Sequence, residues 1–168
     1  QLQLFQTSLH LLLFLFHQPN SLYKHTVSGL GQGLGIGLGL KLGAPDRSVI
    51  VFVGDGSFLY NPITQALGAS RDHELPIIIV VMNNNGYQAM LNGHNLYYSE
   101  GIQKQTELTY GFQIEAPKFE DLGSALNIKG VRVESYEDFR QALIEAMVEN
   151  ESGRTMIINA ILPQYKDD

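Results

Sequence analysis

The sequence contains no cysteine, which excludes a disulfide framework and a thiolate zinc site but does not fix the compartment. Basic residues are also few, with 11 Lys and Arg against 17 Asp and Glu. No basic cluster stands out, so a surface for nucleic acid is not expected. Because the net charge is −6, an anionic ligand would need a metal ion or backbone N–H groups to neutralise it.

The sequence also lacks an apolar run long enough to span a membrane. Its densest run, Leu11–Phe16, is too short for a bilayer. No basic segment precedes it and no small-residue cleavage site follows, so we interpret residues 1–18 as a buried apolar helix rather than a signal peptide. Since the first residue is Gln1 and not Met, we expect a fragment or a processed piece of a larger protein. A cytoplasmic location is a separate expectation.

A run of glycines in residues 28–43 has two interpretations. Glycine occupies every second position from Gly29 to Gly39, which suits a strand and disfavours a helix by propensity. Glycines four apart, such as Gly35 and Gly39, would instead give a helix a flat packing face. No G-x-G-x-x-G register fits the run, so a nicotinamide dehydrogenase is not supported.

Apolar segments alternate with helix-length segments along the rest of the chain. Residues 48–53 and 77–82 predict strands buried on both faces of a parallel sheet. Between them, Pro62 fits the first turn of a helix that ends near Asp72, with Asn61 as its N-cap. The alternation predicts one doubly wound α/β domain over residues 1–168, with a mostly parallel sheet and helices on both faces.

Further elements are expected after the second strand. They are a short helical turn at Gln88–Leu91, an irregular loop at Asn92–Gln105 that suits a lid or partner contact, a helix at Phe119–Leu126, a strand at Val131–Val133, a helix from Tyr136 to about Asn150 capped by Ser135, and a strand at Met156–Leu162.

Polar residues follow the first two predicted strands directly. Gly54–Ser57 carries Asp55, and Asn83–Gly86 carries Asn84. Ligands bind outside the carboxyl ends of the strands in an open parallel sheet, so a carboxylate and a carboxamide are expected at one site. Oxygen ligands without thiols suit a hard cation such as Mg²⁺, shared with phosphate oxygens. Taken singly, each residue is equally a turn former.

The segments GDGS and NNNG, in this order, resemble the thiamine diphosphate (ThDP) enzymes. The match is to their C-terminal pyrophosphate domain, and the pattern is closest to benzoylformate decarboxylase and acetolactate-synthase-like enzymes. The upstream SGLGQG and APDRSVIVFVGDGS segments and the NN-x-G-Y context carry the same likeness. It covers most of residues 19–162.

The resemblance implies how the metal and the diphosphate are held. Asp55 and Asn84 would ligate Mg²⁺ through side-chain oxygens, and Gly86 through its backbone carbonyl. The cation would bridge both phosphates and offset their charge. Gly56 and Ser57 would donate backbone N–H groups to the diphosphate, with the Ser57 hydroxyl beside them.

The resemblance also implies contacts to the rest of the cofactor. Tyr60 and Tyr87 would lie near the diphosphate, although each is equally compatible with plain packing. The carbonyl of Ser28, with Gly29 next to it, would face the 4′-amino group of the aminopyrimidine. Leu30 would be the apolar wedge that holds the cofactor in a V shape, with an ordinary core leucine as the alternative.

Other polar residues have less defined roles. Asn83 is expected to support the metal ligands, and Asn85 to be a turn residue. His94 is either a solvated loop histidine or a proton-transfer group. Thr7 and Ser8 either cap the first helix or contact phosphate.

The function implied by the resemblance is decarboxylation or carboligation of small 2-oxo acids, as a lyase or transferase. No catalytic acid or base is expected in this chain, because the family's activating glutamate lies on a separate pyrimidine-binding domain of the same or a second subunit. A homodimer or homotetramer is implied, with neither nucleic acid nor membrane as partner. The alternatives are a separate cofactor-binding subunit, as in sulfopyruvate-decarboxylase-type enzymes, and an inactive binding module that keeps the fold.

Overall fold

The computed structural model describes residues 23, 29–106 and 111–163. Within them, one parallel sheet has the strand order β1-β2-β4-β3. The strands are β1 (Ile50–Gly54), β2 (Ile78–Asn83), β3 (Lys129–Val133) and β4 (Met156–Ile161). The predicted residues 1–18 helix, Thr7, Ser8 and Ser28 lie outside the described residues. The parallel α/β sheet predicted from the apolar segments is confirmed.

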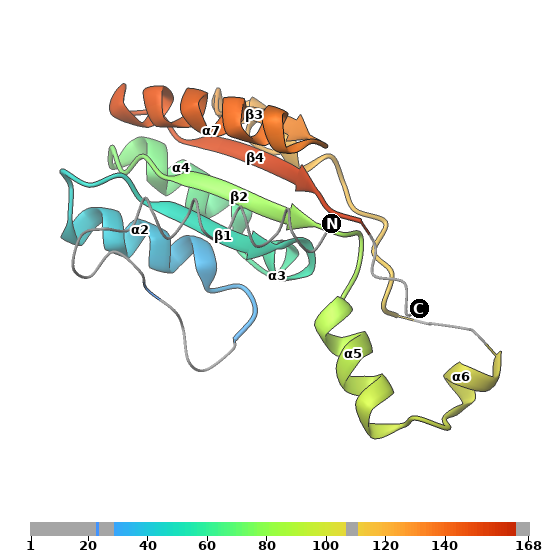
Figure 1. The fold of residues 1–168 in the computed structure, drawn as a ribbon. Coiled ribbons are helices and arrows are strands. Elements are labelled where there is room, and N and C mark those ends of the chain that lie inside the picture. Colours follow the sequence, from blue (N-terminus) through green and yellow to red (C-terminus); the bar gives the residue numbers. More distant parts are fainter. Residues whose placement is uncertain (1–22, 24–28, 107–110, 164–168) are drawn as a thin grey trace.

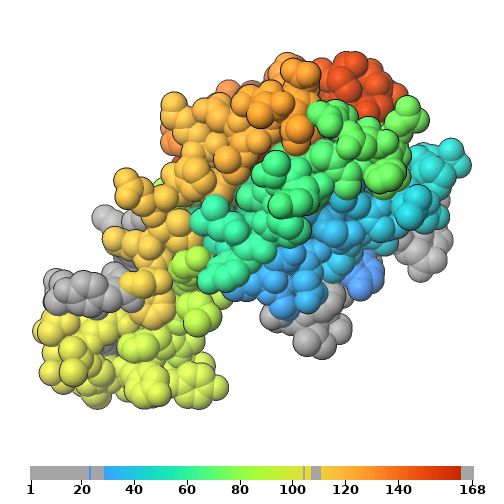
Figure 2. Space-filling view, turned by 180° about the vertical axis from the view of Figure 1, so that it is seen from behind, coloured from blue at the N-terminus to red at the C-terminus, as the bar shows by residue number. Residues whose placement is uncertain are grey.

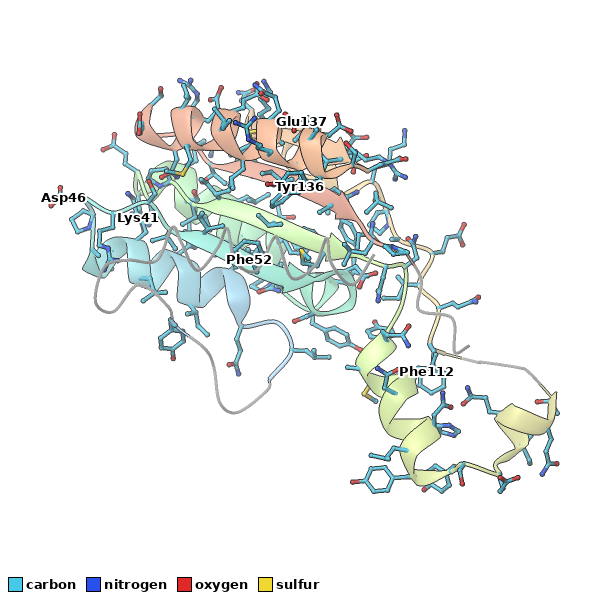
Figure 3. The ribbon with its side chains drawn as sticks, in the orientation of Figure 1. Lys41, Asp46, Phe52, Phe112, Tyr136 and Glu137 are labelled. Carbon is cyan, nitrogen blue, oxygen red and sulfur yellow. The ribbon has the colours of Figure 1, made fainter. Side chains whose placement is uncertain are left out.

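Helices cover both faces of this sheet, as predicted (Figure 1). α2 (Gly33–Gly43) and α4 (Ile63–Asp72) lie on one face, and α7 (Tyr136–Glu151) lies on the other. Alternate strand residues therefore enter two cores: Val51, Val53, Ile79 and Val81 on the first face, and Ile78, Val80, Ile158 and Ala160 on the second. The predicted burial of both strand faces is not found for β1. Phe52 is 38% exposed, because α7 packs mainly on the other three strands (Figure 3).

The glycine run forms a helix, and its glycines serve two different sides. Gly33 and Gly37, four residues apart, face β1, where a Cβ at Gly37 would lie 2.4 Å from Val51 Cγ2. A Cβ at Gly35 or Gly39 would meet no described atom within 4 Å. Close packing on the sheet therefore explains the glycines on only one face of α2. On that face, the packing outweighs the low helix propensity of glycine.

This arrangement predicts opposite effects of the same substitution in α2. Gly39→Ala is expected to stabilise the chain by about 0.5–1 kcal/mol, because alanine restricts the unfolded backbone and meets open space. Gly37→Ala is expected to destabilise it by about 1–3 kcal/mol through overpacking against Val51. Urea unfolding of both variants measures the difference, and equal effects of the two would contradict this account of the packing.

Several predicted elements after β2 are wrong in type or length. The expected loop after residue 91 is mostly helical, since α5 (Gln88–Tyr97) continues through it and α6 (Ile102–Thr106) follows. The Gln88 side chain donates to Asn92 Oδ1 at 2.8 Å, which is an i,i+4 contact that supports a helix. Both helices extend from the body of the molecule near the end of β2, and form a separate lobe in Figure 2.

The predicted helix at residues 119–126 is two 3₁₀ turns, η1 (Phe119–Asp121) and η2 (Ser124–Leu126). Gly123 separates them, and a Cβ there would lie 2.8 Å from the Ile128 side chain. The chain turns back at Asn127, whose φ is 57°. The segment is therefore two separate turns and not one continuous α-helix.

The last helix and strand agree with the prediction. Ser135 Oγ accepts a hydrogen bond from the Asp138 nitrogen at 3.1 Å and caps α7. The predicted apolar face of α7 packs on the second core, through Phe139, Leu143, Ala146 and Met147. No helix in the described part of the chain is long and apolar enough to cross a membrane.

Candidate functional site

The carboxylate of Asp55 is buried where β1 ends. The residue is 3% exposed and begins the short helix α3 (Asp55–Leu59). Oδ1 accepts a hydrogen bond from the Gly56 nitrogen at 2.8 Å, and Oδ2 accepts one from the Gly86 nitrogen at 3.0 Å. Asp55 forms no ion pair with any described residue. Since an unpaired buried charge is costly, this environment favours a bound cation.

The turn after β2 brings further oxygen atoms to Asp55. The Gly86 nitrogen that donates to Asp55 also lies 3.2 Å from Asn84 Oδ1. The Asn85 nitrogen donates to Asn83 Oδ1 at 3.0 Å, and Asn85 has a φ of 56°, which asparagine tolerates better than most residues. The carboxylate of Asp55 and the carboxamide of Asn84 therefore converge on one backbone amide.

A segment distant in sequence, residues 112–114, holds this turn. The contacts between them are the Tyr87 nitrogen to the Phe112 carbonyl at 2.7 Å, the Ile114 nitrogen to the Asn85 carbonyl at 2.9 Å, and an antiparallel bridge between Gly86 and Gln113. Figure 3 shows Phe112 beside α5. A Cβ at Gly86 would lie 2.8 Å from the Phe112 carbonyl oxygen, so this contact requires glycine.

Gly56 leaves room for the ring of Tyr87. A Cβ at Gly56 would lie 2.4 Å from Tyr87 Cε1. The Tyr87 ring also contacts Tyr60, with 6.5 Å between ring centroids and an interplanar angle of 64°. Burial raises the pKa of Tyr87, and its side-chain hydrogen bond with Tyr60 acts in the same direction. The two tyrosines form one pair beside Asp55, and Tyr87 is a neutral phenol at physiological pH.

The turn before α2 reaches the same tyrosine pair. Gly31 has a φ of 83°, and a Cβ there would lie 2.4 Å from the Tyr60 carbonyl oxygen. Leu30 is 53% exposed, which contradicts the alternative of an ordinary core leucine. This exposed apolar side chain, one residue before the glycine that approaches Tyr60, is available to contact a ligand.

Asn61 is not the N-cap that the sequence predicts. α4 begins at Ile63, and the residue at its N-cap position is Pro62. The Asn61 side chain is buried and turns the other way, since Oδ1 accepts from the Leu34 nitrogen at 3.1 Å and Nδ2 donates to the Ser57 carbonyl at 2.9 Å. It thereby ties the first turn of α2 to α3, which positions Ser57.

For Asn83 and His94, the structure differs from what the sequence predicts. Asn83 donates through Nδ2 to Asn159 Oδ1 at 3.1 Å, and a single asparagine inside an apolar strand was the available signal. His94 belongs to α5 and not to a loop, and its ring lies 5.8 Å from that of Phe112. Its proposed part in proton transfer stays a prediction.

The donor set at this site suits a hard divalent cation. The described residues hold no cluster of three or more His, Cys, Asp or Glu that could bind a metal, so a cation here would depend on Asp55 as its carboxylate. The Asn84 carboxamide supplies a second oxygen, which meets the Asp55 carboxylate at the Gly86 nitrogen. Because the protein supplies only a few ligands, the other coordination positions of the cation stay open to phosphate oxygens and water. Mg²⁺ prefers this arrangement.

Comparison with known proteins gives consistent results. The family described as "Thiamine pyrophosphate enzyme, C-terminal TPP binding domain" matches residues 5–160. The probable acetolactate synthase large subunit of Methanocaldococcus jannaschii is 32% identical over 111 residues, which are 66% of this chain and 17% of that protein. The sulfoacetaldehyde acetyltransferase of Alcaligenes xylosoxydans xylosoxydans is 27% identical over 155 residues, 91% of this chain and 24% of that protein.

A solved structure has the same fold. The Rhodococcus jostii thiamine diphosphate-dependent 4-hydroxybenzoylformate decarboxylase superposes with a TM-score of 0.69 at 27% identity, covering 82% of this chain and 24% of that one. The chain thus spans about a quarter or less of the length of these relatives. On the family match, the site at the ends of β1 and β2 lies in a cofactor-binding domain, and the chain belongs to the C-terminal thiamine diphosphate-binding domains of the thiamine diphosphate-dependent enzymes.

Proposed function

We propose that this chain holds thiamine diphosphate through Mg²⁺ in an enzyme that decarboxylates or carboligates 2-oxo acids. The observation that carries the proposal is the convergence of Asp55 Oδ2 and Asn84 Oδ1 on the Gly86 amide, in a site without a basic ion-pair partner among the described residues. Displacement of the Gly86 N–H by a cation would leave both oxygens facing the metal.

The remaining predicted residues take roles that agree with where they lie. Ser57, fixed through Asn61, would present its N–H and hydroxyl to the diphosphate. Tyr60 and Tyr87 would supply neutral hydroxyl groups beside it. Leu30, exposed and adjacent in sequence to Gly31, would contact the cofactor between its rings. Gly56 donates its N–H to Asp55 Oδ1 in this structure, so a phosphate contact would require sharing that donor.

When bound, thiamine diphosphate supplies an electron sink for breaking the bond next to the 2-oxo group. This chain would contribute binding and orientation, while the activating glutamate would come from a pyrimidine-binding domain in the same or a second subunit. Assembly as a homodimer or homotetramer follows from the same proposal.

Calorimetric titration of the complete protein with thiamine diphosphate tests the proposal. We expect binding with Mg²⁺ present and a loss of affinity of at least about 100-fold in EDTA, because the two phosphates lose their counter-charge. Pyruvate and benzoylformate are then the substrates to test for CO₂ release. Equal affinity in EDTA would refute the metal site, and binding without CO₂ release or carboligation from any 2-oxo acid would favour an inactive binding module.

A further inference from the structure

A chain of hydrogen bonds through two buried asparagine side chains runs from η1 to the turn after β2. Glu120 Oε2 accepts from Asn159 Nδ2 at 2.6 Å, and Asn159 Oδ1 accepts from Asn83 Nδ2 at 3.1 Å. Asn83 Oδ1 in turn accepts from the Asn85 nitrogen at 3.0 Å. Asn159 is 1% exposed and Asn83 is 2% exposed, so neither amide is open to bulk solvent and each depends on its partners in the protein.

The chemistry at the two ends fixes the direction of every bond in this chain. The Glu120 oxygen acts as an acceptor, so it faces the NH₂ group of Asn159. The Asn159 oxygen must then face Asn83, which presents its NH₂ group and keeps its own oxygen for the Asn85 N–H. A backbone N–H only donates, so the last bond has the same direction. Neither asparagine can flip without breaking two bonds.

The position of Glu120 is itself fixed by packing on two sides. A Cβ at Gly130 in β3 would lie 1.9 Å from the Glu120 carbonyl oxygen, so glycine lets η1 sit directly on the sheet. The neighbouring Phe119 is fully buried, and its ring meets that of Phe58 edge to face, with centroids 5.4 Å apart. Phe58 belongs to α3, which begins with Asp55. η1 is therefore anchored to the helix that carries the proposed metal-binding carboxylate.

We propose that Glu120 and Asn159 are positioning residues for the Asn83–Gly86 turn, and this rests on the proposed function of that turn. Through Asn83 they hold Asn85 in its left-handed conformation, which costs energy for a non-glycine residue. That conformation directs Asn84 and Gly86 toward Asp55. Neither Glu120 nor Asn159 needs to touch the cofactor to affect its binding.

The test compares Glu120→Ala with Glu120→Gln in the complete protein. Alanine removes the acceptor for Asn159, and we expect the affinity for thiamine diphosphate with Mg²⁺ to fall by about 10-fold or more, as for other supporting partners of metal ligands. Without cofactor, hydrogen exchange of the Asn85 amide should rise about 10-fold, which corresponds to one lost hydrogen bond. Glutamine keeps an acceptor oxygen and should restore both values to within about 3-fold of the original.

Ser70→Ala is the matched control for a merely structural effect. Ser70 Oγ and Thr155 Oγ1, 2.6 Å apart, form a buried pair just before β4, whereas Asn159 lies near its end. This variant should lower the melting temperature but change neither cofactor affinity nor Asn85 exchange. Asn159→Leu, which removes the middle of the chain, is a second variant should Glu120→Ala not fold.

Two outcomes would overturn the proposal: Asn85 exchange unchanged in Glu120→Ala, or an affinity loss in Ser70→Ala as large as in Glu120→Ala. If the unmodified protein binds no thiamine diphosphate while Glu120→Ala still frees the Asn85 amide, the proposed function fails and the positioning of the turn stands.

Discussion

Asp55→Asn is expected to lower the affinity for thiamine diphosphate with Mg²⁺ by at least about 100-fold. The substitution keeps the shape of the side chain but removes the negative charge that would hold the cation. It also places an NH₂ group against either the Gly56 or the Gly86 N–H, since both now donate to the carboxylate. One hydrogen bond is therefore lost in the cofactor-free protein. A fall in stability alone would not distinguish this loss from the loss of metal binding.

The measurement that separates these effects is the rise in melting temperature caused by saturating cofactor and Mg²⁺. A ligand at 100 times its Kd stabilises a protein by about 2.7 kcal/mol, so the unmodified protein should show a clear rise. Asp55→Asn should show none. Asp46→Asn is the control, because Asp46 is an exposed carboxylate in the turn at the other end of β1 (Figure 3). A full rise in Asp55→Asn would refute the metal assignment.

Gly86→Ala is expected to destabilise the protein by about 1–3 kcal/mol, through overpacking, and to weaken cofactor binding at the same time. The new Cβ would lie 2.8 Å from the Phe112 carbonyl oxygen, which is backbone and cannot rotate away. The turn must then separate from residues 112–114, and the bridge between Gly86 and Gln113 is lost. Urea unfolding measures the first effect and calorimetry the second.

Gly93→Ala provides the matched control for that prediction. Gly93 lies in α5, and a Cβ there would meet no described atom within 4 Å. Alanine should stabilise the helix by about 0.5–1 kcal/mol and leave cofactor affinity unchanged. If Gly86→Ala behaved like Gly93→Ala, the close contact with Phe112 would have no part in holding the turn.

The sheet and the oxygen-bearing side chains at its edge could be predicted because both follow from local patterns. Continuous apolar runs identified β1 and β2, and polar residues directly after each run placed Asp55 and Asn84 at the same edge. Local patterns could not decide whether the glycine run forms a helix or a strand. Helix and strand both accommodate its spacing, and the choice depends on Gly37 packing against Val51, which only the assembled fold provides.

The contacts that hold the Asn83–Gly86 turn could not be predicted, because they come from segments distant in sequence. Phe112 contacts Tyr87 across 25 residues of chain, and Asn159 reaches Asn83 from the neighbouring strand. No local pattern encodes either partner. Asn61 failed as a predicted N-cap for a related reason, since burial directed its side chain to α2 and α3 instead of the following helix.

The central claim is that the ends of β1 and β2 hold the cation that binds the diphosphate. Anomalous diffraction from crystals of the complete protein, grown with thiamine diphosphate and Mn²⁺ in place of Mg²⁺, tests it most directly. We expect one anomalous peak about 2.0–2.3 Å from both a carboxylate oxygen of Asp55 and the carboxamide oxygen of Asn84, as hard-cation coordination requires. A bound cofactor with its anomalous peak elsewhere, and with Asp55 still accepting from Gly86, would contradict it.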